Sequence, residues 1–119
     1  MNYPTIVFDF DGVIHSYKSG WKGVENIPDP PVEGIRQVIE DLLERGYRVV
    51  IVSSRCTSPE GIDAIRSWLK QYGFPWIEVM AEKPPALVYV DDRAICFDGK
   101  TEDLYDKITQ FEPWYEKGV

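Results

Sequence analysis

The strongest constraint on the fold is the stretch from Ile6 to Val13, which reads Ile-Val-Phe-Asp-Phe-Asp-Gly-Val. Its three leading apolar residues favour a buried β-strand, and the two aspartates lie where that strand would end. Gly12 follows them, so the backbone can turn sharply there. Two carboxylates about 5 Å apart repel each other by about 3 kcal/mol at an effective dielectric constant of roughly 20. The stretch therefore predicts a divalent cation at this strand end, and we expect Mg²⁺, which prefers oxygen ligands.

Apolar strands alternate with amphipathic helices along the rest of the chain. Strands are predicted at residues 3–9, 48–52, 75–80, 87–90 and 95–97. Helices are predicted where apolar side chains recur on one face at helical spacing, at residues 31–45, 58–72 and 101–111. Strands that are apolar throughout and alternate with helices are typical of a parallel sheet covered on both faces. The pattern predicts a three-layer, Rossmann-like α/β fold.

Length and charge limit the domain organisation and the class of partner. With 119 residues, we expect a single domain over residues 1–119. No apolar run is long enough to cross a membrane, and no basic and apolar leader opens the chain, so we expect a cytoplasmic protein. The net charge of -7 argues against non-specific nucleic-acid binding, which needs lysine and arginine. Cys56 and Cys96 match no metal or redox spacing, and both are expected to be buried.

Residues 12–30, called the flap below, are predicted to form an irregular loop because glycines and prolines interrupt them. The flap carries several groups that could contact a ligand, namely His15, Tyr17, Lys18, Trp21 and Lys22. Trp21 and Tyr17 could equally pack the flap onto the body of the protein. His15 could be an ordinary loop residue or could contact a leaving group.

Polar side chains follow the predicted strands at one edge of the sheet. Ligands of parallel α/β sheets lie outside the carboxyl ends of the strands. The first strand ends in Asp9 and Asp11, the second is followed by Ser53, Ser54 and Arg55, and the fourth is followed by Asp91 and Asp92, with Lys83 in the loop before it. We therefore expect four carboxylates, a hydroxyl group and an ammonium group to share one crevice.

These segments, in this order, resemble the motifs of the haloacid dehalogenase superfamily of phosphohydrolases. The segment from Phe8 to Val13 is similar to the first motif, and the segment from Val50 to Ser53 is similar to the second. Lys83-Pro84 is similar to the third motif, and Asp91-Asp92 to the fourth. The resemblance spans residues 5–97 and rests on the combination of four motifs.

The resemblance implies a hydrolase of phosphate monoesters, a phosphatase that requires Mg²⁺. Asp9 is the implied nucleophile, which takes the phosphoryl group as an aspartyl-phosphate, and Asp11 is the implied general acid and base. Mg²⁺ is implied to bind the Asp9 carboxylate, the Asp11 backbone carbonyl and Asp92, with Asp91 as an indirect or alternate ligand. A carboxylate needs such cationic compensation before it can attack a phosphate dianion.

The resemblance also implies that Ser53 and Lys83 hold the phosphoryl oxygens, and Ser54 and Arg55 are further candidates for phosphate or substrate binding. Each has a structural alternative. Ser53 could cap a helix, Lys83 could be a solvated surface charge, and Arg55 could form a surface ion pair. Asp91 and Asp92 could simply be turn residues.

The chain departs from many relatives in this superfamily in the lengths of two segments between the motifs. Residues 12–30 and 54–82 are too short for an inserted cap domain, so the resemblance implies a capless member with an open site, which a second subunit could cover. A small phosphate ester fits the acidic composition better than a polynucleotide end. The competing functions are a receiver-like domain and a phosphate-binding scaffold without turnover. A receiver-like domain is disfavoured because Lys83 precedes the fourth strand and no aspartate ends the third.

Overall fold

The structure is a computed structural model and describes residues 4–116. Its strands are β1 (Thr5–Asp9), β2 (Arg48–Val52), β3 (Glu78–Met80) and β4 (Val88–Val90). Its α-helices are α1 (Ile35–Glu44), α2 (Pro59–Gln71) and α3 (Leu104–Thr109), and two short 3₁₀ helices are η1 (Ser54–Thr57) and η2 (Trp114–Glu116). Tyr3, in the predicted first strand, lies outside the described residues.

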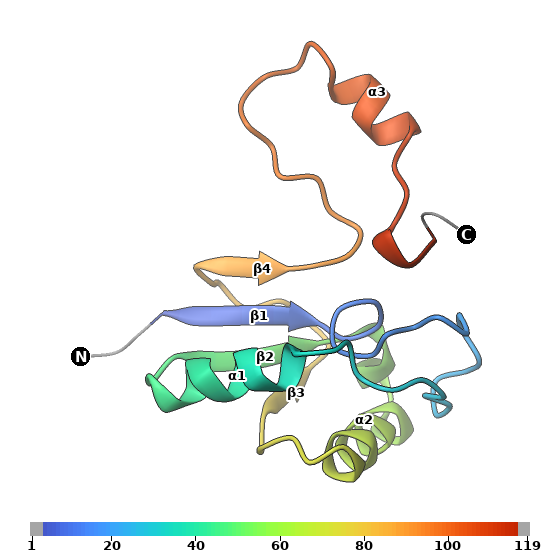
Figure 1. Ribbon diagram of the computed structural model, residues 1–119, viewed down its shortest axis with the longest axis vertical. Coiled ribbons are helices and arrows are strands. Elements are labelled where there is room, and N and C mark those ends of the chain that lie inside the picture. The colour runs from blue at the N-terminus through green and yellow to red at the C-terminus, as the bar shows by residue number, and fades with distance from the viewer. Residues whose placement is uncertain (1–3, 117–119) are drawn as a thin grey trace.

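The four strands form one parallel sheet in the order β3-β2-β1-β4, as Figure 1 shows. From β1 to β3 the chain adds strands on one side of β1, and it then crosses back to add β4 on the other side. In the register, Phe8 of β1 lies between Ile51 of β2 and Val90 of β4. The strand order reverses between β1 and β4, which is where ligands bind in open α/β sheets.

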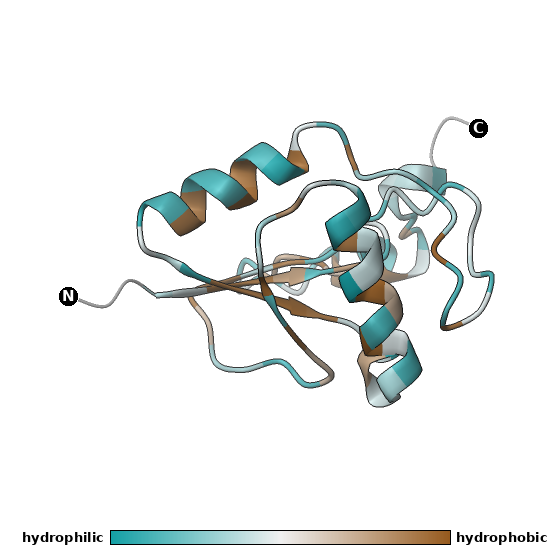
Figure 2. Cartoon of the chain, turned by 90° about the horizontal axis from the view of Figure 1, so that it is seen from below, coloured by the Kyte–Doolittle hydropathy of each residue, from teal (hydrophilic) through white to brown (hydrophobic). Residues whose placement is uncertain are grey.

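One face of the sheet carries the main core. Ile6 and Phe8 of β1 pack there with Ile39 of α1 and with Ile65 and Leu69 of α2. Figure 2 shows the hydrophobic side of α1 turned toward the strands and its hydrophilic side turned away. Burial of these side chains contributes roughly 1.5–3 kcal/mol each, so this face supplies most of the stability of the sheet.

The other face is covered by less material. Val7, Val50 and Val52 form a smaller cluster, against which Met80 and Ala86 pack. Within residues 4–116, no helix residue belongs to this cluster, and residues 81–87 cross from β3 to β4 without a helix. The predicted α/β fold, Rossmann-like around a parallel sheet, is confirmed. Helices α1 and α2 both contribute to the main core on one face, whereas the predicted helix cover of the other face is not seen among the described residues.

Local signals set the helix boundaries. The Ser58 hydroxyl accepts a hydrogen bond from the backbone N–H of Gly61 at 3.2 Å, and Pro59 occupies the first turn of α2. The helix predicted at 31–45 begins only at Ile35, because Gly34 before it adopts a left-handed conformation with φ of 85°.

The segment after β4 differs most from expectation. The strand predicted at 95–97 is wrong: these residues are irregular and Cys96 is exposed, whereas Cys56 is buried as expected. Figure 1 shows residues 94–111, called the arm below, swinging away from the sheet before the chain returns. The helix α3 in the arm has no buried residue, and Tyr105 is 76% exposed. Among the described residues, no helix is long and apolar enough to span a membrane.

Candidate active site

Three carboxylates meet at the point where the strand order reverses. Asp9 is the last residue of β1, and Asp91 and Asp92 directly follow β4. One carboxylate oxygen from each lies within 4.8 Å of the others, and all three side chains are partly buried. The strands β1 and β4 are adjacent and parallel, so the residues at their carboxyl ends lie side by side.

The electrostatics of this cluster disfavour charge on Asp9 in the absence of a cation. Burial, a hydrogen bond with Asp92, and the negative charges of Asp91 and Asp92 raise the pKa of Asp9 from 3.8 to about 8. A divalent ion among the three carboxylates would reverse this effect, because it favours the ionised form of each.

The hydrogen bonds indicate which carboxylate oxygens are free to bind a metal. Asp91 accepts hydrogen bonds from the Lys83 ammonium at 3.3 Å and from the backbone N–H of Arg93 at 2.8 Å. Asp92 Oδ1 is buried and has no hydrogen-bond partner among residues 4–116. A buried carboxylate oxygen without a donor is costly unless a cation or a water molecule satisfies it. The donor set therefore fits Mg²⁺, with Asp9 and Asp92 as the better placed ligands.

The Asp11 side chain turns away from this cluster. Its two oxygens accept hydrogen bonds from the Arg55 guanidinium at 3.0 and 3.1 Å, and Oδ1 also lies 2.8 Å from Nδ1 of His15. Burial alone would raise the pKa of Asp11, but hydrogen bonds from His15 and Arg55 and the positive charge of Arg55 hold it below 3.8. The prediction that the Asp9 and Asp11 carboxylates share a metal ion is therefore wrong for the Asp11 side chain, which faces Arg55 and His15.

His15 connects Asp11 to the flap. Its Nε2 accepts a hydrogen bond from the backbone N–H of Asp29 at 3.1 Å. Because that N–H can only donate, the ring proton of neutral His15 is assigned to Nδ1, which donates to Asp11. The flap is further fixed by Trp68, whose indole N–H donates to the Asp29 carbonyl at 3.0 Å. His15 is a fully buried structural partner, so the leaving-group contact considered for it is not observed.

Arg55 holds the flap from inside the protein. It is 0% exposed, and its Nη1 donates to the carbonyls of Gly23 and Val24 at 2.7 and 2.8 Å while the rest of the guanidinium faces Asp11. Neither of the two interpretations of Arg55, a substrate contact or a surface ion pair, describes this arrangement. It is a buried ion pair that joins the first strand end to the flap.

A cleft of about 180 Å³ opens beside the carboxylates. Predicted and unpredicted residues line it together: Asp9, Asp11, Tyr17, Trp21, Ser53, Ser54, Asp92, Arg93 and Tyr115. The Ser53 oxygen accepts the backbone N–H of Arg55 at 3.1 Å and so caps η1, as the structural alternative predicted. Its own hydroxyl proton remains available for a ligand in the cleft.

Lys83 lies at the outer side of the cluster and does not line the cleft. Its side chain is 53% exposed and pairs with Asp91 at 3.3 Å. The ammonium lies near enough to partly neutralise the cluster, and an exposed lysine can move toward a bound anion at little cost.

Sequence reasoning missed Arg93 and Tyr115 as lining residues. Arg93 directly follows Asp92 in the sequence, so its place in the cleft could have been predicted from this adjacency. Tyr115 reaches the cleft from the end of the described chain and donates a hydrogen bond to Asp92 across a separation of 23 residues. No local pattern could have predicted this contact. Burial and the neighbouring Asp92 raise the pKa of Tyr115 to about 12, so its hydroxyl stays protonated.

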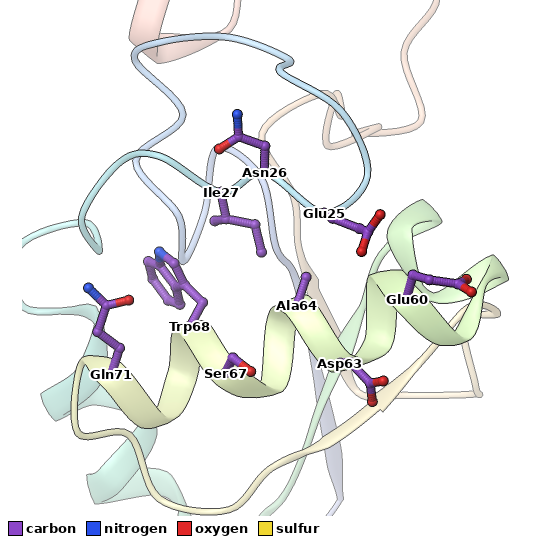
Figure 3. A pocket seen from close by; sticks show the side chains of 9 residues that line it. All are labelled: Glu25, Asn26, Ile27, Glu60, Asp63, Ala64, Ser67, Trp68 and Gln71. Atoms are coloured by element: carbon purple, nitrogen blue, oxygen red, sulfur yellow. The ribbon is translucent and has the colours of Figure 1, made fainter.

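A larger hollow of about 530 Å³ lies between the flap and α2, where Figure 3 shows Ile27 above Ala64 and Trp68. Its charged side chains are all acidic, namely Glu25, Glu60 and Asp63. Carboxylates repel anions, and the described residues that line this hollow include no lysine, arginine or histidine that could offset the three negative charges. The smaller cleft beside Asp9 is therefore the better candidate for phosphate chemistry.

The comparisons with known proteins bear on the fold. The sequence matches no family model, and no curated protein is significantly similar to it. A solved structure of a conserved protein from Bacteroides thetaiotaomicron is similar, with a TM-score of 0.60 over 92% of this chain and 92% of that chain. The two sequences are 21% identical, so the likeness shows a shared fold and nothing about activity.

Proposed function

We propose that this protein is a Mg²⁺-dependent phosphohydrolase that cleaves phosphate monoesters. The observation that carries the proposal is the convergence of Asp9, Asp91 and Asp92 on the strand-order reversal, with the buried Asp92 Oδ1 left without a donor. A cluster of this kind serves phosphoryl transfer because such transfer depends on positioning and charge compensation. The resemblance of the four sequence motifs points the same way.

The chain supplies a nucleophile and a phosphate cradle. An Asp9 carboxylate oxygen attacks phosphorus, the bond from phosphorus to the ester oxygen breaks, and the aspartyl-phosphate forms. Water then attacks the same phosphorus atom and releases inorganic phosphate and Asp9. Asp9 and Asp92 would hold Mg²⁺, which would supply charge compensation for the phosphoryl oxygens. The Ser53 hydroxyl donates to one of those oxygens, and Lys83 approaches from the rim.

Asp11 is proposed as the base that activates the hydrolytic water. A base must be ionised, and the hydrogen bonds from Arg55 and His15 favour that form of Asp11, while they also lower its affinity for the proton that it takes from water. Acting as the acid toward the leaving group requires a proton that this environment does not favour. Substrates whose leaving group needs no protonation, such as aryl phosphates, are therefore expected to phosphorylate Asp9 with little help from Asp11.

The proposed substrate is a small phosphate monoester. The cleft volume of about 180 Å³ suits a phosphate group with a modest leaving group, and the acidic chain lacks the positive surface that a polynucleotide needs. A cytoplasmic location and a homo-oligomer stay predictions from the sequence and the resemblance.

The test is hydrolysis of a panel of phosphate esters, covering aryl, sugar, nucleotide and 3′-phosphorylated oligonucleotide substrates, with Mg²⁺ or with EDTA. We expect Mg²⁺-dependent turnover of small esters, and loss of about 1,000-fold or more in Asp9→Asn, the scale of removing a nucleophile. Unchanged turnover in Asp9→Asn would eliminate Asp9 as the nucleophile. Phosphate binding without turnover would favour the silent scaffold, and a preference for oligonucleotides would replace the proposed substrate class.

A further inference from the structure

The end of the described chain returns to the carboxylate cluster. Trp114 and Tyr115 in η2, called the hook below, lie at the far end of the arm. The Trp114 indole N–H donates to the Gly12 carbonyl at 2.6 Å, and the Tyr115 hydroxyl donates to Asp92 Oδ2 at 2.9 Å. Figure 1 shows η2 close to the turn after β1, although the arm between them extends well away. Two hydrogen bonds thus anchor the hook to the loops that carry the candidate metal ligands.

The hook also contacts the flap beside the cleft. The Tyr115 ring meets the Tyr17 ring edge to face, with centroids 5.3 Å apart and planes at 90°. Tyr17 belongs to the flap and has a positive φ of 61°, which is unusual for a residue with a side chain. Tyr17 and Tyr115 both line the cleft, so the flap and the hook meet at its wall.

The two oxygens of Asp92 have different surroundings. Oδ2 accepts the hydrogen bond from Tyr115, whereas Oδ1 is buried and has no hydrogen-bond partner in the described part of the chain. A hydrogen bond to one oxygen restricts the rotation of the whole carboxylate, so it also holds the second oxygen in place within the cluster of Asp9, Asp91 and Asp92. The Asp92 carboxylate would then need no reorientation when a cation binds.

We infer that Tyr115 is a positioning residue that orients Asp92 for Mg²⁺. The inference rests on the proposed function, because it assigns Tyr115 a role toward the metal of that site. Donors that hydrogen-bond to metal-binding side chains commonly change metal affinity about 10- to 100-fold when they are removed. The alternative is that Tyr115 only packs the hook against the flap, a role that the ring alone would fill.

The test is calorimetric titration of the full chain with Mg²⁺ in the absence of substrate. Tyr115→Phe removes the hydroxyl and keeps the ring that packs on Tyr17. Tyr105→Phe is the matched control, because it makes the same change on the exposed arm helix. We expect Tyr115→Phe to raise the Mg²⁺ dissociation constant about 10-fold, with Tyr105→Phe equal to the natural sequence.

A second measurement separates positioning from folding. Aryl phosphate turnover by Tyr115→Phe should approach the natural rate once Mg²⁺ is saturating, and its circular dichroism spectrum should be unchanged. If the natural sequence binds Mg²⁺ and Tyr115→Phe binds it equally well, the role of Tyr115 is refuted and the proposed function stands. If the natural sequence takes up no Mg²⁺, the proposed function itself fails. If high Mg²⁺ does not restore turnover, Tyr115 acts in some way other than positioning Asp92.

Discussion

Gly12 is the residue on which the close approach of β1, β4 and the hook depends. Its φ is 85°, and a Cβ atom there would collide with the Asp92 carboxylate and come within 2.7 Å of Tyr115 Cε1. Only glycine accommodates both the backbone conformation and the approach of these two side chains.

We therefore predict that Gly12→Ala weakens Mg²⁺ binding and lowers stability by more than the strain of its backbone conformation alone. Gly20→Ala is the control, because Gly20 has a φ of 75° and nothing within 4 Å of the position of its Cβ. The control should lose about 1–2 kcal/mol on urea denaturation and keep its metal affinity. Equal stability and equal Mg²⁺ affinity in the two variants would show that Asp92 and Tyr115 do not need their observed positions.

The environment of Asp11 leads to a second prediction at this scale. Asp11→Asn removes the proposed base but leaves Asp9 intact, so an aryl phosphate should release about one equivalent of phenol rapidly and then turn over about 100-fold or more slowly. Stopped-flow absorbance would measure both phases. Circular dichroism should accompany the assay, because the variant also removes the charge partner of buried Arg55. Steady-state turnover at the natural rate would refute the role of Asp11.

These residue contacts also mark the limit of what sequence could predict at this scale. Asp9 and Asp92 were predictable because Asp9 ends β1 and Asp92 closely follows β4, and adjacent parallel strands bring their carboxyl ends together. The burial predicted for the fourth strand is wrong, since Val88 and Tyr89 are 45% and 44% exposed. The orientation of Asp11 was not predictable, because its partner Arg55 lies 44 residues away and was interpreted as either a substrate contact or a surface ion pair. The end of a strand determines the backbone position of an aspartate, whereas hydrogen-bond partners far away in the sequence determine the orientation of its carboxylate.

Among the elements, the flap is held by a few polar contacts rather than by a helix or strand. Asp29 accepts hydrogen bonds from the Ser19 backbone N–H at 2.8 Å and from the Ser19 hydroxyl at 2.6 Å. Burial alone would raise the pKa of Asp29, but these bonds outweigh it and hold the pKa below 3.8. Because the pKa of Asp29 is lower in the folded protein than in the unfolded chain, ionised Asp29 stabilises the fold at pH values above its pKa in the unfolded chain. This contribution is lost as the pH falls through its pKa in the folded protein.

This linkage predicts that Asp29→Asn is less stable than the natural sequence at pH 7, by on the order of 1 kcal/mol. The difference should shrink when both proteins are denatured with urea at acidic pH, since Asp29 is then protonated in the natural sequence as well. A difference that stays constant from pH 7 down to acid would show that the charge of Asp29 does not hold the flap.

The elements themselves were largely predictable, with exceptions that have physical reasons. Strands β1 and β2 and helix α2 carry clear apolar patterns and capping residues, and each formed where it was predicted. The pattern at 95–97 is also apolar, but Phe97 is 58% exposed because that segment leaves the body and pairs with no strand. A short apolar run becomes a strand only where a partner edge is available, and sequence pattern does not report that.

At the scale of the whole molecule, the arm is the feature that neither the fold class nor the motifs indicated. It leaves β4, exposes Tyr105 and Ile108, and returns to place the hook against Asp92 and Gly12. The hydrogen bond between Trp114 and Gly12 joins residues that are 102 positions apart in the sequence, so it holds the hook beside the turn that follows β1. Long-range closure of this kind depends on the three-dimensional path of the arm, which no local pattern contains.

The central claim is that Asp9 and Asp92, brought together from adjacent strands, hold one divalent cation. The most direct measurement is a crystal structure of the full chain soaked in Mn²⁺, a stand-in for Mg²⁺ that gives an anomalous signal. The account predicts one strong anomalous peak coordinated by carboxylate oxygens of Asp9 and Asp92, with the Tyr115 hydroxyl still on Asp92 Oδ2. No peak between these side chains at saturating Mn²⁺, or a peak only elsewhere, would contradict it.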